Sequence, residues 1–487
     1  MSNLSIWLKP IWLLSLGTTA GLAILIVLWG ILYLVNRRAA IAVGNSVREG
    51  ILLPVTYTLA ALGFLALLAT PTMDPSELVN SLKRLTDVGQ VEITETIPAN
   101  TPDYPIEISF RPDELQEYSF DSDQDLAINV EKGKGYIEPV LQIEGNQLYQ
   151  WSPGSSLPRG FEDEVDTLYF TNETDLPSKM TAIITSDVAM PEVHYLPLAA
   201  LSVIGLYLGY LLITLLAPKA AIIASATSKE AISQPLFLLL ILIGIAALVL
   251  YVYVPYNTFG EDVKMLKTSG MATIKVLAII FALWTASVSV ADEIEGRTAL
   301  TVLSKPVSRR QFILGKFLGI VWPILLMFLI LGTVFLLTVS YKVVYDARES
   351  AKTTPIWNDC FIEVVRIIPG LILAFYEAVV MAAISVAIST RLAMLPNLII
   401  CGSIYVLGHL GPLIVKSSAG EIVFVKFIGR LISIVLPVLD HYEIEGAIAG
   451  ASSVPSEYLL LALLYSLLYC AAAMLLALLF FEDRDLA

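Results

Sequence analysis

The stretch ADEIEGRTALTVLSKPVSRRQFILGKF, residues Ala291 to Phe317, decides how the rest of the chain is interpreted. It is polar and lies between two apolar runs, Met271–Val290 and Leu318–Val339, each close to the ~20 residues that cross a bilayer. We therefore predict a loop between two spanning helices. It carries the densest basic cluster of the chain, Arg297, Lys305, Arg309, Arg310 and Lys316. Because short basic loops stay on the cytoplasmic side, we expect this loop there.

The residues inside this loop predict its local structure. Thr298 is expected to cap a short helix, Ala299–Leu303, which Pro306 terminates. Ser308 and Gln311 have the spacing of a capping box that opens the next long helix. A short helix lying crosswise at the membrane face is what a membrane protein needs in order to be pushed by a cytosolic motor.

The same residues resemble the signature loop of type-2 ATP-binding-cassette (ABC) exporter permeases. The likeness is carried by Glu293-x-Glu295-Gly-Arg-Thr, Leu303-Ser-Lys-Pro-Val-Ser-Arg-Arg, Leu314-Gly-Lys316 and Phe259-Gly-Glu-Asp262. It covers about residues 220–481, is strongest over 258–317 and is weak before residue 220. In that family the loop holds a coupling helix that docks onto the ATP-binding subunit.

The resemblance implies a role for each part of the loop. Coupling to the ATPase is expected of Glu293, Glu295, Arg297, Thr298, Leu300, Leu303, Ser304 and Pro306. The cytoplasmic basic cluster would be completed by Lys305, Arg309, Arg310 and Lys316. The family also implies a dimer of permeases and two separate ATPase chains, which bind ATP and magnesium. The alternative for this stretch is an ordinary basic loop held inside by its charge alone.

Composition indicates a membrane protein. Of the 487 residues, 56% are hydrophobic and 15% are charged, against roughly 25% charged in soluble proteins. We expect an all-α polytopic membrane protein with about nine spans: Ile11–Val35, Ile51–Ala69, Leu196–Leu216, Pro235–Val254, Met271–Val290, Leu318–Val339, Val364–Ile388, Leu398–Val415 and Tyr458–Phe480. Residues 422–439 are apolar but contain Lys426 and Arg430, so we interpret them as re-entrant or interfacial, with a full span left open.

The predicted organisation has four parts. Residues 1–70 form an N-terminal transmembrane helix pair, 71–195 an extracytoplasmic domain, 196–219 a third transmembrane helix, and 220–487 a six-helix type-2 permease core with the cytoplasmic coupling loop 291–317. The charges flanking the first run place the amino terminus outside. We expect the plasma (inner) membrane as the location, with membrane lipids around the helices.

Residues 71–195 are the one soluble domain that we expect. They carry 24 acidic and 7 basic residues, a net charge of −17, whereas the rest of the chain carries +3. This balance argues against a nucleic-acid partner. Short β-branched or alternating runs separated by turn residues predict an antiparallel sandwich or barrel: Val91–Ile97, Ile106–Phe110, Leu126–Val130, Tyr136–Ile143, Leu148–Trp151, Thr167–Phe170 and Thr181–Thr185.

Two motifs in this domain invite a functional interpretation. Asp121, Asp123 and Asp125 lack the glycine and the glutamate that a calcium loop needs at its sixth and twelfth positions, so we expect a solvated acidic loop without metal. The Asn172-Glu-Thr174 sequence is a glycosylation sequon by pattern only.

The sequence gives little evidence for chemistry in this chain. It contains no G-x-x-x-x-G-K-[ST] run, so we expect neither an ATPase site nor enzymatic activity, and no cofactor of its own. Glu377 is the clearest intramembrane acid. We interpret it either as a cavity or subunit-contact acid, or as a buried acid satisfied by Tyr376, a neighbouring helix or water. Lys275 is expected to lie at the outer end of its span and to extend outward.

With so few charges deep in the spans, the sequence favours an external energy source over a proton-driven transporter. Together with the resemblance to type-2 ABC exporter permeases, this predicts the membrane-spanning subunit of an ATP-driven ABC exporter. The alternative is an envelope assembly or anchoring protein, whose outer β-domain binds a partner without transport. An associated ATPase would discriminate between these two functions.

Overall fold

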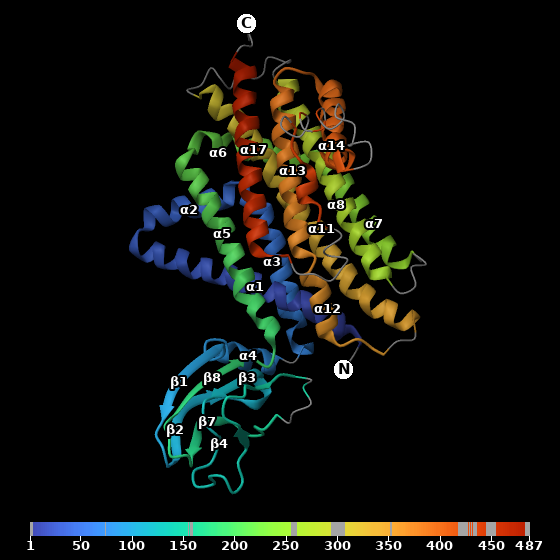
Figure 1. Cartoon of the computed structure of the whole chain (residues 1–487). Coiled ribbons are helices and arrows are strands. Elements are labelled where there is room, and N and C mark those ends of the chain that lie inside the picture. Colours follow the sequence, from blue (N-terminus) through green and yellow to red (C-terminus); the bar gives the residue numbers. More distant parts are fainter. Residues whose placement is uncertain are drawn as a thin grey trace. The chain divides into compact units, whose positions relative to one another are not determined.

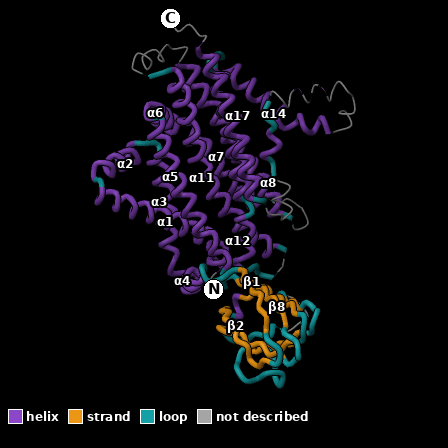
Figure 2. Tube along the Cα trace, turned by 60° about the vertical axis from the view of Figure 1, so that its left-hand side comes forward, coloured by secondary structure: helices purple, strands orange, loops and turns teal. Residues whose placement is uncertain are grey.

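The computed structural model of the chain describes residues 3–73, 75–153, 155, 159–254, 261–293, 307–350, 353–416, 427, 429, 431, 436–444 and 454–482. Two compact units make up the chain (Figure 1). The helical unit comprises Met1–Ala69 and Leu198–Ala487, and the β unit comprises Thr70–Pro197. Figure 2 shows that the described strands are confined to one of these units. The fold is therefore mostly helical with an inserted all-β region, as the sequence predicts.

The helices outside the β unit occur in chain order with these bounds: α1 (Asn3–Val35), α2 (Arg37–Glu49), α3 (Leu52–Ala69), α5 (Tyr195–Leu216), α6 (Pro218–Ser233), α7 (Pro235–Tyr253), α8 (Asp262–Ala286), the π-helix η4 (Ser287–Asp292), α11 (Arg309–Glu349), α12 (Trp357–Val365), α13 (Ile368–Ser389), α14 (Met394–Lys416), the 3₁₀-helix η6 (Leu439–Tyr442) and α17 (Ser456–Glu482).

Eight helices in the described part of the chain are long and apolar enough to cross a membrane. They correspond to eight of the nine predicted spans. The ninth, Leu398–Val415, falls on α14, whose apolar stretch Met394–Leu410 is shorter than the other eight. Most of the predicted re-entrant segment 422–439 lies outside the described residues. The number and apolar character of these helices establish a multi-pass membrane protein.

α11 is longer than a span requires. It has 41 residues, so at ~1.5 Å per residue it extends about 60 Å, roughly twice the hydrocarbon core of a bilayer. The predicted span Leu318–Val339 is only its middle part. The ends of α11 must therefore project beyond the apolar layer, and its first turns carry Arg309, Arg310 and Lys316 of the 291–317 loop.

A short helix, α2, connects α1 to α3. Its first turn is capped by Asn36, whose Oδ1 accepts a hydrogen bond from the Ala39 amide at 3.2 Å. The exposed residues Arg37, Arg38 and Arg48 give it a basic, polar surface. Trp29 of α1 donates its indole N–H to the Ala40 carbonyl at 2.9 Å and so ties α2 back to α1.

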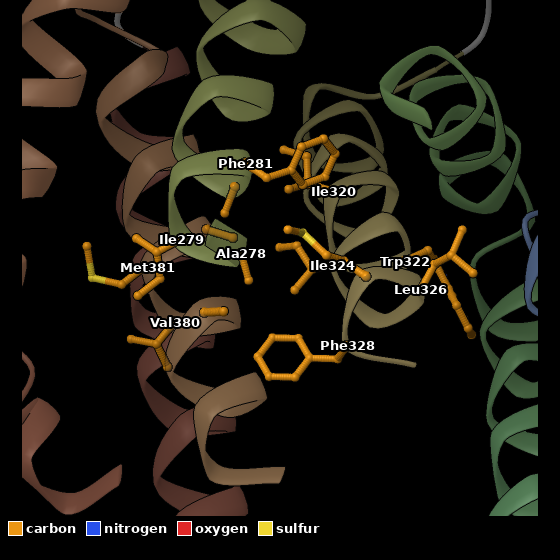
Figure 3. Close-up of a cluster of buried hydrophobic side chains, with 14 of the residues drawn as sticks. Ala278, Ile279, Phe281, Ile320, Trp322, Ile324, Leu326, Phe328, Val380 and Met381 are labelled. Carbon is orange, nitrogen blue, oxygen red and sulfur yellow. The ribbon is translucent and has the colours of Figure 1, made fainter. Parts of the chain in front are cut away.

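The core of the helical unit lies between α8, α11 and α13. In Figure 3, Ala278 and Phe281 of α8 face Ile320 and Ile324 of α11, with Met381 of α13 behind α8. All five side chains are buried. Trp322 projects from the opposite side of α11 (Figure 3). Its indole meets the ring of Tyr210 of α5 edge-on, with 5.7 Å between centroids. α11 is thus the central helix, with partners on two sides.

The β unit contains η1 (Thr70–Thr72), α4 (Pro75–Arg84), β1 (Gln90–Ile97), β2 (Thr101–Phe110), η2 (Pro112–Glu114), β3 (Leu115–Ser122), β4 (Leu126–Asn129), β5 (Leu141–Ile143), β6 (Tyr149–Trp151), β7 (Val165–Asn172), β8 (Ser178–Ser186) and η3 (Pro191–His194). Two antiparallel four-stranded sheets form, with strand orders β1-β8-β3-β6 and β2-β7-β4-β5. One apolar core draws residues from both sheets, so the unit is a sandwich.

Each of the seven predicted strands matches a strand of the structure in whole or in part. An eighth, β3, was not predicted, because its sequence LQEYSFDS is rich in polar residues. Its alternate residues Tyr118 and Phe120 are fully buried. Tyr118 stacks on Tyr149 and Trp151 and donates its hydroxyl hydrogen to the Arg159 carbonyl at 3.1 Å. Burial raises the pKa of this phenol well above its usual range.

The acidic motif and the sequon of the β unit both make hydrogen bonds that hold its loops in place. Asp123 Oδ1 accepts the Lys179 amide at 2.7 Å, and Asp125 Oδ1 accepts the Gly145 amide at 2.7 Å. Asn172 is buried and donates its side-chain amide to the carbonyls of Pro98 and Leu176 at 3.1 and 3.0 Å. These contacts give the acidic loop and the sequon a structural role.

Candidate functional site

The structure describes both ends of the 291–317 loop but not residues 294–306 between them. The predicted short helix Ala299–Leu303 lies outside the described residues. So do eight of the predicted site residues: Glu295, Arg297, Thr298, Leu300, Leu303, Ser304, Lys305 and Pro306. The described site residues of the loop are Glu293, Arg309, Arg310 and Lys316.

A salt bridge joins the two ends of the loop. Lys316 Nζ lies 2.5 Å from Glu293 Oε1. The Lys316 side chain is 5% exposed and that of Glu293 is 26% exposed, so the contact is largely shielded from solvent. Glu293 directly follows η4, and Lys316 lies in the first turns of α11. The pair therefore holds the end of one spanning helix to the start of the next.

The start of α11 is fixed by its cap. Ser308 Oγ accepts the Gln311 amide at 3.3 Å, and Gln311 Oε1 accepts the Ser308 amide at 3.1 Å. This is the predicted capping box, and it is confirmed. Arg310 is exposed at the same turn.

Arg309 connects the start of α11 to the end of α17. Its Nη1 donates to the carbonyls of Phe481 and Glu482 at 3.0 and 2.8 Å. A helix leaves its last carbonyls without partners, and a cation there also suits the helix dipole. The rings of Phe312 and Phe481 stack beside this contact, 5.8 Å apart. Thus Arg309, predicted only as part of a basic cluster, also acts as a helix cap.

Small residues let α6 pack closely on α11. A Cβ added at Gly315 would lie 2.7 Å from Ile223 Cβ, and one at Gly319 would lie 2.6 Å from Thr227 Cβ and 2.8 Å from the Ala224 carbonyl. The Gly315-x-x-x-Gly319 spacing puts both glycines on one face of α11, the arrangement that lets membrane helices approach closely. α6 therefore fixes the part of α11 that follows the loop.

A buried polar cluster lies at the start of the π-helix η4. Asn397 Nδ2 of α14 lies 2.7, 2.8 and 2.9 Å from the hydroxyl oxygens of Ser287, Ser385 and Ser389, which share its two hydrogens. All four residues are fully buried. The cluster joins η4, α13 and α14 in one place. Because single π-turns inside helices often occur at functional sites, this junction is a second candidate element of the site.

The predicted intramembrane acid, Glu377 of α13, is fully buried and lies between two cations or potential cations. Lys275 Nζ of α8 is 3.5 Å from its Oε2, and His409 Nε2 of α14 is 3.3 Å from its Oε1. The interpretation that Glu377 meets a neighbouring helix agrees with these contacts. The expected outward orientation of Lys275 is wrong, because its side chain is only 7% exposed and points to Glu377.

Sequence reasoning missed three of these features: the Asn397 cluster, the Glu293–Lys316 pairing and the Lys275–Glu377–His409 cluster. A signal was present for the last, since Lys275 and His409 both interrupt apolar runs. The spans thus hold more interacting charge than the sequence indicated.

The structure thus combines helices able to span a membrane, an inserted sandwich and a polar loop whose two ends are joined by a salt bridge. The family model for ABC-2 family transporter proteins matches residues 45–407, and the chain belongs to this family. It is therefore an ABC-2 type permease. The match includes the β unit and begins far before residue 220, where the motif resemblance was weak. No curated protein matches the chain.

Proposed function

We propose that the chain is the membrane subunit of an ATP-driven exporter, and that the 291–317 loop receives the movement of a separate ATPase. The supporting observation is the Glu293–Lys316 salt bridge, which makes the two helices entering and leaving the loop a single mechanical unit. ATP and magnesium would bind on the partner ATPase. Two copies of the permease would form the complex.

The contacts around the loop indicate where a movement would go. A displacement at the loop reaches α8 through η4 and reaches α11 directly. From α11 it passes to α6 through the Gly315–Gly319 face and to α17 through Arg309. From η4 it passes to α13 and α14 through Asn397. The loop is thus bonded or packed to most of the helices that follow residue 218.

This function places the loop in the cytoplasm and the β unit on the other face of the inner membrane. The basic residues of the loop favour the inside, since short basic loops are retained there. The chain crosses the membrane once between the β unit and α6, through α5, and twice more, through α7 and α8, before the loop. An odd number of crossings separates the β unit from the loop.

The test of this function introduces a charged residue on the apolar face of the predicted coupling helix. Leu300 and Leu303 are three apart and share one face of a helix. Burying one leucine is worth roughly 1.5–3 kcal/mol, so Leu303→Asp should weaken docking about tenfold or more. The measurement is the amount of ABC ATPase, identified by its own P-loop sequence, that co-purifies with the chain, together with transport-linked ATP hydrolysis. Both should fall while membrane insertion stays normal.

The matched control is Val406→Asp in α14, whose side chain is 50% exposed among apolar neighbours. An aspartate at a helix centre costs roughly 2.5–3.5 kcal/mol of insertion energy. This variant should fail through low protein level rather than lost docking. If Leu303→Asp keeps full ATPase binding and hydrolysis, the loop does not couple, and the anchoring function becomes the better explanation.

A further inference from the structure

The membrane interior contains three ionisable side chains in contact, one from each of three helices. Glu377 is fully buried, with Lys275 Nζ at 3.5 Å and His409 Nε2 at 3.3 Å from its two oxygens. Lys275 and Glu377 lie near the middle of α8 and α13. The side chains of Lys275 and His409 are 7% and 16% exposed. This cluster is therefore deep in the spans, where charge is expensive and usually has a function.

The contact made by His409 Nδ1 determines whether Nε2 presents a hydrogen or a lone pair to Glu377. His409 Nδ1 lies 3.1 Å from the backbone carbonyl of Tyr405. A carbonyl only accepts, so this contact assigns a hydrogen to Nδ1. A neutral imidazole has one N–H, and its Nε2 would then turn a lone pair toward the Glu377 carboxylate. Two such groups 3.3 Å apart in a low-dielectric interior repel each other unless a proton lies between them.

We propose that this cluster is a proton-binding site within the membrane. Lys275 carries its own proton as an ammonium group. In addition, the cluster takes up one proton from water at the contact between His409 Nε2 and Glu377 Oε1, and it returns that proton to water on release. Only an N–H or O–H bond forms and breaks. The loaded cluster carries a net charge of +1 and holds α14 against α13. The empty cluster is neutral, and the two helices then meet through a repulsive contact.

The contact between His409 and Glu377 is the site that exchanges a proton near neutral pH, because the other titratable groups around Glu377 ordinarily ionise at higher pH. Among the described residues, the remaining titratable groups close to the cluster are Tyr442 of η6, Cys470 of α17, Tyr376 beside Glu377, and Tyr405, whose ring centroid lies 4.6 Å from that of His409. Phenols and thiols ordinarily ionise near pH 10 and 8.5. α8 carries no charged residue over 276–286, and α11 carries none over 318–341.

The proton site and the loop act on the same helices. α8, α13 and α14 meet at Lys275, Glu377 and His409, and η4, which continues α8, meets α13 and α14 again at Asn397. Ser287 of that second junction opens the π-helix that leads to the loop. The proton site goes beyond ATPase coupling and does not depend on it, because its three residues belong to α8, α13 and α14 and not to the loop.

The test locates the proton in the full-length chain in detergent. The chain has only three histidines, so [¹⁵N]histidine labelling gives three pairs of imidazole nitrogen signals, and His409→Gln identifies the pair of interest. His194→Gln and His441→Gln assign it by elimination if His409→Gln does not fold. At pH 7 we expect either a doubly protonated His409 ring or an infrared band of a protonated carboxyl that disappears in Glu377→Gln. A neutral His409 ring together with an ionised Glu377 would overturn the proposal.

The second readout is the dependence of thermal stability on pH. Because the folded state binds the extra proton, this proton stabilises the fold fully at low pH. The stabilisation is lost as the pH rises past the value at which the site releases the proton. Between about pH 6.5, where a histidine in the unfolded chain loses its proton, and the higher pH at which the folded site releases it, the folding equilibrium constant falls about tenfold per pH unit. In Glu377→Gln an amide N–H can donate to the His409 Nε2 lone pair, and in His409→Gln an amide N–H can donate to Glu377. Neither contact then needs the extra proton, so both variants should lose this slope. His441→Gln should keep it. An unchanged slope in both cluster variants would also refute the site.

Discussion

At the scale of single residues, the salt bridge between Lys316 and Glu293 joins the two ends of the 291–317 loop. Their contact is only 2.5 Å long and Lys316 is almost fully buried, so removing the lysine leaves an acid in a partly desolvated place. Breaking a fully buried pair costs about 3–5 kcal/mol. Because Glu293 keeps 26% exposure, we expect the smaller cost of losing one hydrogen bond between charged groups, about 1.5–3 kcal/mol, for Lys316→Met.

The prediction for Lys316→Met is a lower melting temperature of the chain in detergent and less co-purified ATPase. Lys264→Met is the matched control. It breaks the Lys264–Glu261 pair, whose side chains are 43% and 60% exposed, and such pairs contribute at most about 1 kcal/mol. The double variant Glu293→Gln with Lys316→Met should recover part of the loss. Equal melting temperatures for Lys316→Met and Lys264→Met would show that the buried pair contributes nothing special.

At the scale of elements, the packing of α6 on α11 depends on residues without side chains. Gly319→Ala places a Cβ 2.8 Å from the Ala224 carbonyl, a backbone atom that cannot rotate away. Overpacking of this kind costs typically about 1–3 kcal/mol. We therefore expect a lower melting temperature, with α6 displaced from α11.

Gly332→Ala is the control for this substitution in the same helix. Its added Cβ would meet only Leu371 Cδ1 at 3.5 Å, an ordinary contact. Alanine is favoured over glycine in helices by about 1 kcal/mol, so Gly332→Ala should be neutral or stabilising. A melting temperature for Gly319→Ala at or above that of the wild type would contradict the close approach of the two helices.

The β unit gives a second prediction at this scale. Residues 71–195 expressed alone should be soluble, with β-type circular dichroism and cooperative melting, because one core links both sheets. Within that domain Tyr118→Ala in β3 should cost about 3–5 kcal/mol, since the ring is fully buried among Tyr149, Trp151 and Phe161.

Ile137→Ala is the comparison for Tyr118→Ala. Its side chain is 90% exposed, and surface substitutions usually change stability by less than about 0.5 kcal/mol. A mainly helical or disordered isolated domain would refute its independence. Similar melting of the two variants would refute the central place of β3.

At the scale of the whole molecule, the proposed topology can be tested by labelling. Ser308 is exposed at the start of α11, whereas Ser122 belongs to the β unit. Single cysteines at each position, in a chain whose Cys360, Cys401 and Cys470 are replaced, should differ toward an impermeant thiol reagent in intact cells. The Ser122 side chain is only 2% exposed, so the exposed position Ile137 is also changed to cysteine and labelled in parallel.

We expect labelling of Ile137→Cys and protection of Ser308→Cys. The reason is that an impermeant reagent reaches only the outer face, and an odd number of spans separates the two positions. Lysed cells provide the control, in which Ser308→Cys becomes reactive. Labelling of Ser308→Cys but not Ile137→Cys in intact cells would reverse the whole arrangement.

Local sequence patterns determined the spans, the capping box at Ser308 and seven of the eight described strands. Each of these depends on residues close in sequence, through apolar length, a three-residue spacing or alternation. β3 was missed because its burial comes from pairing with β8 and β6, not from its own composition. The short coupling helix remains a prediction.

Tertiary structure alone decided which polar residues meet. Asn397 and Ser287 are 110 residues apart, and nothing local to either sequence position indicates the other. The same holds for the Lys275, Glu377 and His409 cluster, whose members come from three separate helices. The physical reason is that a buried polar group must find a partner on whichever helix packs beside it, and helix packing is set by the whole bundle.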